Sequence, residues 1–161
     1  MRSISFMEEN GMGASFVLDG NDWQSTHIVV YADDEPVGTV RIRWFRDFAQ
    51  FERTSFRAQW RNPFVIKACA QFAFAHVARK GFDKVITHAN PRYALLWRKL
   101  LGFRVVEGKE PLLLEGHPDP YVELEKILDI PANVLGPATN AEVLFRVEGS
   151  WDEPGKQEAV R

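Results

Sequence analysis

Residues 52–81 read ERTSFRAQWRNPFVIKACAQFAFAHVARKG, and this stretch contains the end of a strand and the whole of a long helix. Asn62 is a suitable N-cap, and Pro63 suits the first helical position because its missing N–H is not needed there. Gly81 follows the last basic turn as a stop signal. These signals predict a helix over residues 62–80.

The predicted helix is apolar around most of its circumference. Only a narrow polar stripe runs through Lys67 and Gln71, so we expect a sheet to cover the rest. Cys69 lies in mid-helix among alanines and phenylalanines, where a thiol is desolvated and inert. We therefore expect Cys69 to pack in the core and not to act as a nucleophile.

Three strands are predicted before the helix. Period-2 alternation and β-branched residues favour strands at 27–31, 37–45 and 48–56. The turn ADDEP at 32–36 joins the first two as a hairpin. The pattern therefore predicts an antiparallel meander.

After the helix, the order of elements implies a crossover. A strand at 84–89, a helix at 91–101 ended by Gly102, and a strand at 103–106 are predicted in turn. A segment rich in Gly and Pro follows over 107–120, and then a strand at 121–128. Parallel neighbours are needed somewhere in this order, so we predict an α/β fold, an α+β mixed sheet with helices packed on it.

Size and composition narrow the function classes. A chain of 161 residues with 45% hydrophobic residues builds one globular domain, predicted over 1–130 with its core at 27–128. Residues 131–161 are expected to form an appendage, with a short strand at 143–147 and a mobile tail. No stretch approaches the roughly 20 apolar residues of a membrane span, and the N-terminus lacks a signal peptide, so a cytoplasmic protein is expected.

Charge and ligand types exclude further classes. The net charge of −2 provides no global positive field, so we do not expect a nucleic-acid partner. One cysteine excludes an intramolecular disulfide and a multi-thiol metal site. The histidines show no metal-ligand spacing, so no metal is expected; they are His27, His76, His88 and His117.

Several segments resemble one enzyme superfamily. Residues 52–61, ERTSFRAQWR, resemble the GNAT acyltransferase segment E-R-L-A-V-x-P-E-Y-R-G-x-G-x-G, with Arg61 on its final arginine. The helix ends at the family's usual spacing, and residues 90–103, NPRYALLWRKLLGF, are similar to N-x-x-A-x-x-x-Y-x-x-x-G-F. Residues 35–39, EPVGT, resemble the family's hairpin and third strand. The resemblance covers about residues 27–128 and implies a GNAT-like fold with a shortened N-terminal part.

The resemblance implies an acyl-CoA-dependent N-acyltransferase, by default an acetyltransferase. In that fold two neighbouring strands, here 48–56 and 84–89, splay apart and bind the pantetheine arm of acetyl-CoA or a longer acyl-CoA. Free amides near Ser55 and Phe56 would polarise the thioester, which a small-molecule amine attacks directly in a ternary complex. The helix N-terminus favours a pyrophosphate. The implied binding residues are Thr54, Ser55, Phe56, Arg61, Asn62, Phe64, Val65, Ile66, Lys67, Asn90 and Trp97.

The sequence departs from the family in three places. Asn62, Phe64 and Ile66 replace glycines, and Pro63 removes a donor, so a phosphate is expected to sit differently or to bind weakly. Trp97 stands where a tyrosine commonly acts as general acid. About 25 residues precede the first strand, so the acceptor pocket is open or is closed by a homodimer partner or by the appendage. A catalytically silent binding protein is the alternative function.

A narrower resemblance concerns the donor. The phrases HIVVY at 27–31, PVGTVR at 36–41 and PLLLEG at 111–116 are similar to autoinducer synthases and N-acyl amino-acid synthases. That branch implies a longer acyl thioester on CoA or acyl carrier protein, whose acidic surface would face an arginine series. The simpler interpretation is a solvated strand face with one phosphate contact. The series is Arg41, Arg43, Arg46, Arg53, Arg57 and Arg61.

Three residues have both a functional and a structural interpretation. Glu52 is a candidate general base, or it forms an ion pair with a neighbouring arginine. His88 is a rival base, or a buried histidine bonded to the backbone. Asn90 binds the pantetheine arm, caps the helix that begins at Pro91, or does both.

Overall fold

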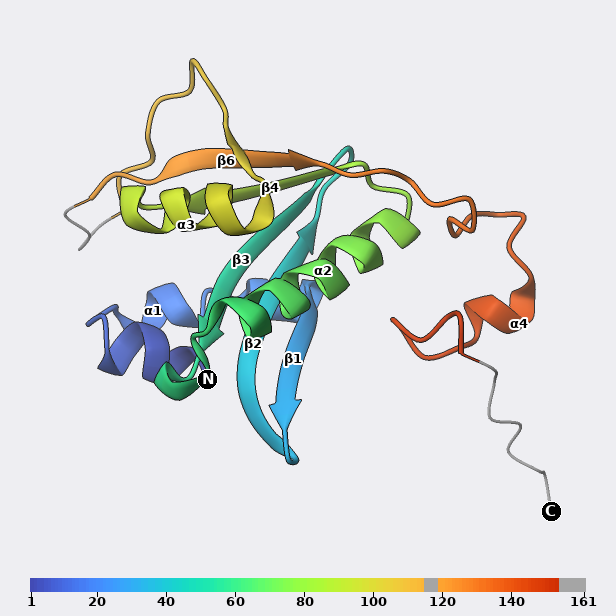
Figure 1. The fold of residues 1–161 in the computed structure, drawn as a ribbon, viewed down its shortest axis with the longest axis horizontal. Coiled ribbons are helices and arrows are strands. Elements are labelled where there is room, and N and C mark those ends of the chain that lie inside the picture. The colour runs from blue at the N-terminus through green and yellow to red at the C-terminus, as the bar shows by residue number, and fades with distance from the viewer. Residues whose placement is uncertain (115–118, 154–161) are drawn as a thin grey trace.

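In the computed structural model, which describes residues 1–114 and 119–153, the chain is built around a six-stranded sheet of order β1-β2-β3-β4-β6-β5 (Figure 1). Among the strand pairs of the described residues, only β3/β4 is parallel. This mixed sheet confirms the predicted fold class. The strands are β1 Thr26–Ala32, β2 Glu35–Trp44, β3 Ala49–Phe56, β4 Lys84–Ala89, β5 Arg104–Val105 and β6 Val122–Ile127.

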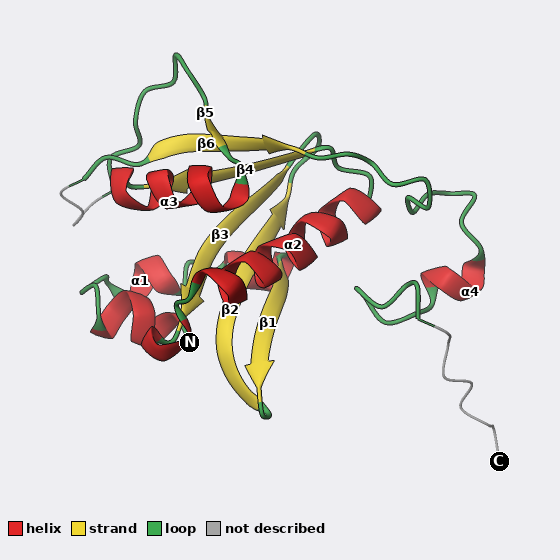
Figure 2. Ribbon diagram, viewed as in Figure 1, coloured by secondary structure: helices red, strands yellow, loops and turns green. Residues whose placement is uncertain are grey.

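Two long helices pack on one face of the sheet, α2 over Pro63–Arg79 and α3 over Pro91–Leu101 (Figure 2). The core lies between them and the strands, and Ile42, Val77 and Leu124 are fully buried there. Short helices make up the rest of the described helical structure. They are η1 Ser3–Glu8, α1 Ala14–Val17, η2 Asn21–Gln24, η3 Ala58–Trp60 and α4 Ala141–Leu144.

Local capping chemistry places both long helices where the sequence predicts them. The Asn62 side chain accepts the N–H of Val65 at 3.0 Å, and the Asn90 side chain accepts the N–H of Tyr93 at 3.1 Å. Gly102 ends α3 with a φ of +74°, a left-handed conformation that glycine adopts without strain. An N-cap asparagine followed by proline is thus a reliable helix start at both positions.

Two predictions about local structure are wrong. The strand predicted at 143–147 is in fact α4 with its following turn, because Asn140 caps a helix start by accepting the N–H of Glu142 at 2.8 Å. The exposed stripe of α2 is also wider than predicted: besides Lys67 and Gln71 it includes Phe64, which is 83% exposed, and Phe72. Phe64, Ala68 and Phe72 recur every four residues, so they share the face that points away from the sheet.

Residues 131–153, the described part of the expected appendage, pack along the C-terminal end of α2. Trp151 is buried and stacks on His76, with ring centroids 5.0 Å apart. Arg79 pairs with Asp152 at 3.0 Å. The described part of the appendage therefore lies at the end of α2 opposite Pro63, and the option that the appendage closes the acceptor pocket stays a prediction. The mobile tail is predicted for the last residues of 131–161, and residues 154–161 lie outside the described residues.

The contact between His76 and Trp151 should make stability depend on pH. Burial lowers the pKa of His76 below its usual 6.5; Lys80 acts in the same direction and Glu148 opposes it. Because the unfolded chain binds the proton more readily, this contribution is complete above pH 6.5 and shrinks as the pH falls below it. The free energy of unfolding of the wild type, measured with urea, should be lower at pH 5.5 than at pH 7.5. A His76→Phe variant should show a smaller difference between the two pH values. An unchanged difference in the variant would contradict the assignment.

Candidate active site

Strands β3 and β4 form a ladder at one end only. Their parallel pairing covers Ala49–Val85, Gln50–Ile86 and Phe51–Thr87 and then stops. Beyond that point β3 stays paired with β2 as far as Phe56, and β4 stays paired with β6 as far as Ala89. The two strands therefore part as a V, with the starts of α2 and α3 at its open end (Figure 1). The predicted splay is confirmed.

A β-bulge bends β3 at the start of the gap. The pairs Thr39–Ser55 and Arg41–Glu52 leave two residues of β3 opposite one residue of β2, and Arg53 has a φ of +51°. The Arg53 side chain holds this conformation by donating to the carbonyl of Phe16 at 2.7 Å and by lying 3.9 Å from the centre of its ring. The sequence carries no glycine to signal this left-handed residue, so the bulge could not be predicted.

One backbone donor faces the gap. The N–H of Arg57 bonds to the carbonyl of Val37 on β2 at 2.9 Å, and successive peptide groups of a strand point to opposite edges. The N–H of Phe56 therefore faces away from β2, toward the gap, whereas that of Ser55 faces β2. The Phe56 carbonyl accepts Arg61 Nε at 2.8 Å, consistent with this direction.

A mostly apolar cavity lies between the parting strands and the helices α2 and α3. Its volume is about 30 Å³, room for one or two water molecules. Thr87 crosses the gap, since its hydroxyl donates to the carbonyl of Phe51 at 2.9 Å. Of the predicted binding residues, four line this cavity: Thr54, Phe56, Ile66 and Trp97.

The Phe56 ring takes its position from a glycine. A Cβ at Gly38 would come within 2.3 Å of Phe56 Cδ1 and Cε1. A Gly38→Ala substitution should therefore lower the free energy of unfolding by about 1–3 kcal/mol, because the ring must move or the strands must separate. Urea unfolding measures this. Gly136→Ala, with no atom within 4 Å of the added Cβ, is the control and should unfold like the wild type; equal behaviour of the two variants would contradict the packing argument.

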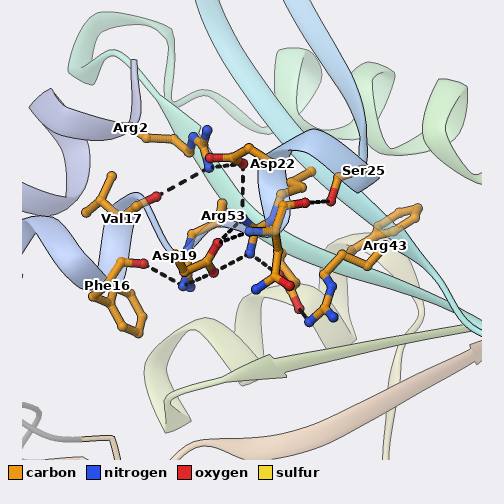
Figure 3. Close-up of polar contacts among 12 residues, drawn as sticks. Arg2, Phe16, Val17, Asp19, Asp22, Ser25, Arg43 and Arg53 are labelled. Atoms are coloured by element: carbon orange, nitrogen blue, oxygen red, sulfur yellow. Dashed lines mark hydrogen bonds and ion pairs between the residues drawn. The ribbon is translucent and has the colours of Figure 1, made fainter.

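A buried ion cluster lies on the other face of β2 and β3 (Figure 3). Arg41 is only 1% exposed and donates to Asp19 at 2.7 Å, to Asp22 at 3.0 Å, and through Nε to Glu52 at 3.1 Å. The hydrogen bond from Arg41 holds the pKa of Asp19 well below its usual range, and Arg2 followed by Arg41 lowers the pKa of Asp22. These ion pairs hold the N-terminal segment, through Asp19 and Asp22, against the sheet.

This cluster corrects the interpretation of the arginines as a solvated face. Arg41 is buried and Arg53 is largely covered, so neither can meet an acidic partner, whereas Arg46 is 94% exposed. The cover comes from residues 19–22, which the strand pattern does not reveal. Glu52 lies within the cluster, paired with Arg41 and with Arg43 at 3.5 Å, which is the ion-pair interpretation.

His88 shares the face of Glu52. Phe51 and Thr87 line the cavity, so the next residue of each strand points to the opposite face. His88 is half-buried, 27% exposed, and its Nε2 lies 3.4 Å from a carboxylate oxygen of Glu123, its register partner on β6. Glu123 also binds Lys109. The predicted alternative of a buried histidine bonded to backbone does not match this carboxylate contact, and sequence analysis missed Glu123.

The remaining predicted residues lie around the open end. Asn62 and Asn90 act as helix caps there. Phe64 and Lys67 are exposed, Val65 is half-buried, and Ser55 is buried. Arg61 is held by the Phe56 carbonyl and by Glu9. Cys69 is buried and its pKa is raised to about 11, which disfavours the thiolate and agrees with a packing role.

Across residues 1–114 and 119–153, no three His, Cys, Asp or Glu side chains are grouped so that they could hold a metal ion. Within the same residues, no helix has both the length and the apolarity needed to cross a bilayer.

Comparison with solved structures gives the class of fold. A Lactobacillus plantarum protein assigned as an N-acetyltransferase is 27% identical and has a TM-score of 0.69; the match covers 79% of this chain and 86% of that one. An acyl-CoA N-acyltransferase from Pseudomonas aeruginosa is 16% identical, with a TM-score of 0.66 over 78% and 84% of the two chains. A GNAT family acetyltransferase from Elizabethkingia anophelis, with acetyl-CoA bound, is 12% identical, with a TM-score of 0.61 over 77% and 88%.

The chain therefore has the GNAT fold, as its sequence predicts. No protein-family model matches the sequence, and no curated protein matches it. The narrower resemblance to autoinducer synthases stays a prediction, and the end of the phrase PLLLEG, residues 115 and 116, lies outside the described residues.

Proposed function

We propose that this protein is an N-acyltransferase that moves an acyl group from a pantetheine thioester, as in acyl-CoA, to a small amine. The observation that carries the proposal is the parting of β3 and β4 after Phe51, with the Phe56 N–H facing the gap. Unpaired strand edges can bind the amide groups of a pantetheine arm. The structural neighbours, which are acyltransferases and include one with acetyl-CoA bound, support this activity.

The Phe56 N–H is placed to stabilise the charge that develops in the reaction. The amine nitrogen attacks the thioester carbon, and negative charge develops on the carbonyl oxygen. A fixed backbone donor stabilises this oxyanion without having to reorganise. The C–S bond then breaks, the thiolate leaves, and the proton lost by the amine is taken by a base.

We assign the base to His88 in preference to Glu52. Both carboxylate oxygens of Glu52 already accept arginine N–H groups, so both are engaged in the ion cluster and neither points freely toward an amine. His88 lies beside the gap on the face opposite α2 and α3, and it is partly accessible. Glu123, 3.4 Å away, would orient the imidazole and stabilise the imidazolium, acting as a positioning residue.

Thiol release tests the proposal directly. The protein is mixed with acetyl-CoA, or with a longer acyl-CoA, and with a panel of small primary amines, and free thiol is followed by a colorimetric reagent. We expect thiol release that requires both substrates, because direct transfer needs a ternary complex. If no pair of substrates releases thiol, the proposed acyltransferase activity is wrong, and the alternative of a catalytically silent binding protein is favoured.

A further inference from the structure

Helix α2 begins at the open end of the gap, where the far part of a nucleotide-bearing donor would lie. The start of a helix ordinarily leaves its first N–H groups unpaired, and these groups bind phosphates well. How many remain unpaired at α2 therefore bears on which part of the donor the protein recognises.

The first turn of α2 has few unpaired N–H groups that could bind an anion. Pro63 has no N–H, and the N–H of Val65 is bound by the side chain of Asn62 at 3.0 Å. The N–H of Ile66 bonds to the carbonyl of Asn62 at 3.1 Å. Of the first three helical residues, only Phe64 keeps an N–H for which the described residues supply no acceptor.

The two arginines near this end of α2 are also engaged. Arg61 donates to the carbonyl of Phe56 at 2.8 Å and forms an ion pair with Glu9. Arg57 pairs with Glu35 at 2.9 Å. Lys67 is exposed one turn into the helix, and the Phe64 ring, 83% exposed, presents an apolar surface at its start. This end of α2 is thus poor in groups that would hold a pyrophosphate.

The gap itself keeps its donors. The Phe56 N–H faces it, and β3 and β4 no longer pair with each other beyond Phe51 and Thr87. We propose that the protein recognises the acyl-pantetheine arm of its donor and not the pyrophosphate and adenosine of CoA. This inference rests on the proposed function. Its consequence is that an acyl-pantetheine arm should serve as donor whether CoA or a carrier protein bears it.

Donor analogues test this inference. Acetyl-CoA, acetyl-phosphopantetheine and acetyl-pantetheine are compared by kcat/KM and, without any amine, by calorimetric Kd. We expect the three values to agree within about fivefold, since the extra phosphates find few partners. A preference for acetyl-CoA above about a hundredfold would overturn the inference and leave the proposed function intact.

Further outcomes distinguish failure of the proposed function from failure of this inference, and distinguish CoA from a carrier protein as the bearer of the donor. If all three thioesters bind with similar Kd values but release no thiol, the proposed acyltransferase activity is wrong and the inference about the pantetheine arm is supported. If none of them binds, both the proposed activity and the inference are wrong. Acetyl–acyl carrier protein is tested as a fourth donor. If its kcat/KM exceeds that of acetyl-pantetheine, a carrier protein is the natural bearer of the pantetheine arm; if its kcat/KM is lower, CoA is the natural bearer.

A gain-of-function variant provides an independent test. Asn62→Gly combined with Pro63→Ala frees the N–H of Val65 and adds one at position 63, while glycine remains an acceptable N-cap. The Kd for CoA should tighten about tenfold, with that for acetyl-pantetheine unchanged. Asn140→Gly, which removes the cap of α4, is the control and should change neither. Circular dichroism checks that α2 remains folded; with α2 intact, an unchanged or parallel response of the two ligands would overturn the inference.

Discussion

Replacing Arg41 by methionine should lower the free energy of unfolding by about 3–5 kcal/mol. The methionine fills much of the same space but leaves the carboxylates of Asp19, Asp22 and Glu52 beside one another without their shared cation. Arg41 is 1% exposed, so water cannot take over its role without opening the structure. Urea unfolding followed by tryptophan fluorescence at pH 7 measures the loss.

The matched control is Arg46→Met, because Arg46 is 94% exposed and its pair with Asp47 is on the surface. This change should stay within about 0.5 kcal/mol. In the wild type, the contribution of Asp19 and Asp22 is complete above pH 3.8 and is lost as the pH falls below it, since both pKa values are depressed from 3.8. Arg41→Met should show less of this acid dependence. If Arg41→Met were as stable as the wild type at pH 7, the stabilising role of the Arg41 ion pairs would be contradicted.

Features that depend on local chemistry could be predicted from the sequence. Both long helices begin at Asn-Pro because the side-chain cap and the missing N–H act within one turn. The meander follows from period-2 alternation. The gap between β3 and β4 came from the family resemblance, since nothing in the alternation of residues 48–56 indicates where a ladder stops.

Features that depend on contacts between distant segments could not be predicted. Alternation places Arg41 and Glu52 on one face, but their burial comes from Asp19 and Asp22 on the N-terminal segment. The partner of His88 is fixed by the register of β4 with β6, a long-range pairing. The polar stripe through Lys67 and Gln71 marks the exposed face of α2, but it does not show that this face extends to Phe64 and Phe72.

Replacing His88 by alanine should lower kcat/KM by about 10²- to 10⁴-fold, the usual contribution of a positioned general base. Its side chain is partly exposed and outside the core, so urea unfolding should change little. Exogenous imidazole should restore part of the activity, which would not happen if His88 only filled space. Thiol release at saturating amine is the assay.

Glu52→Gln is the comparison that separates the two candidate bases. The amide keeps the shape of Glu52 but loses the charge paired with Arg41, so the variant should unfold at lower urea. Per folded molecule it should keep kcat/KM within about tenfold of the wild type, because the base is elsewhere. Glu123→Gln should fall between the two, since it loses the orienting carboxylate and keeps the imidazole. If His88→Ala retained its rate while folded Glu52→Gln lost a hundredfold or more, Glu52 would be the base despite its arginine partners.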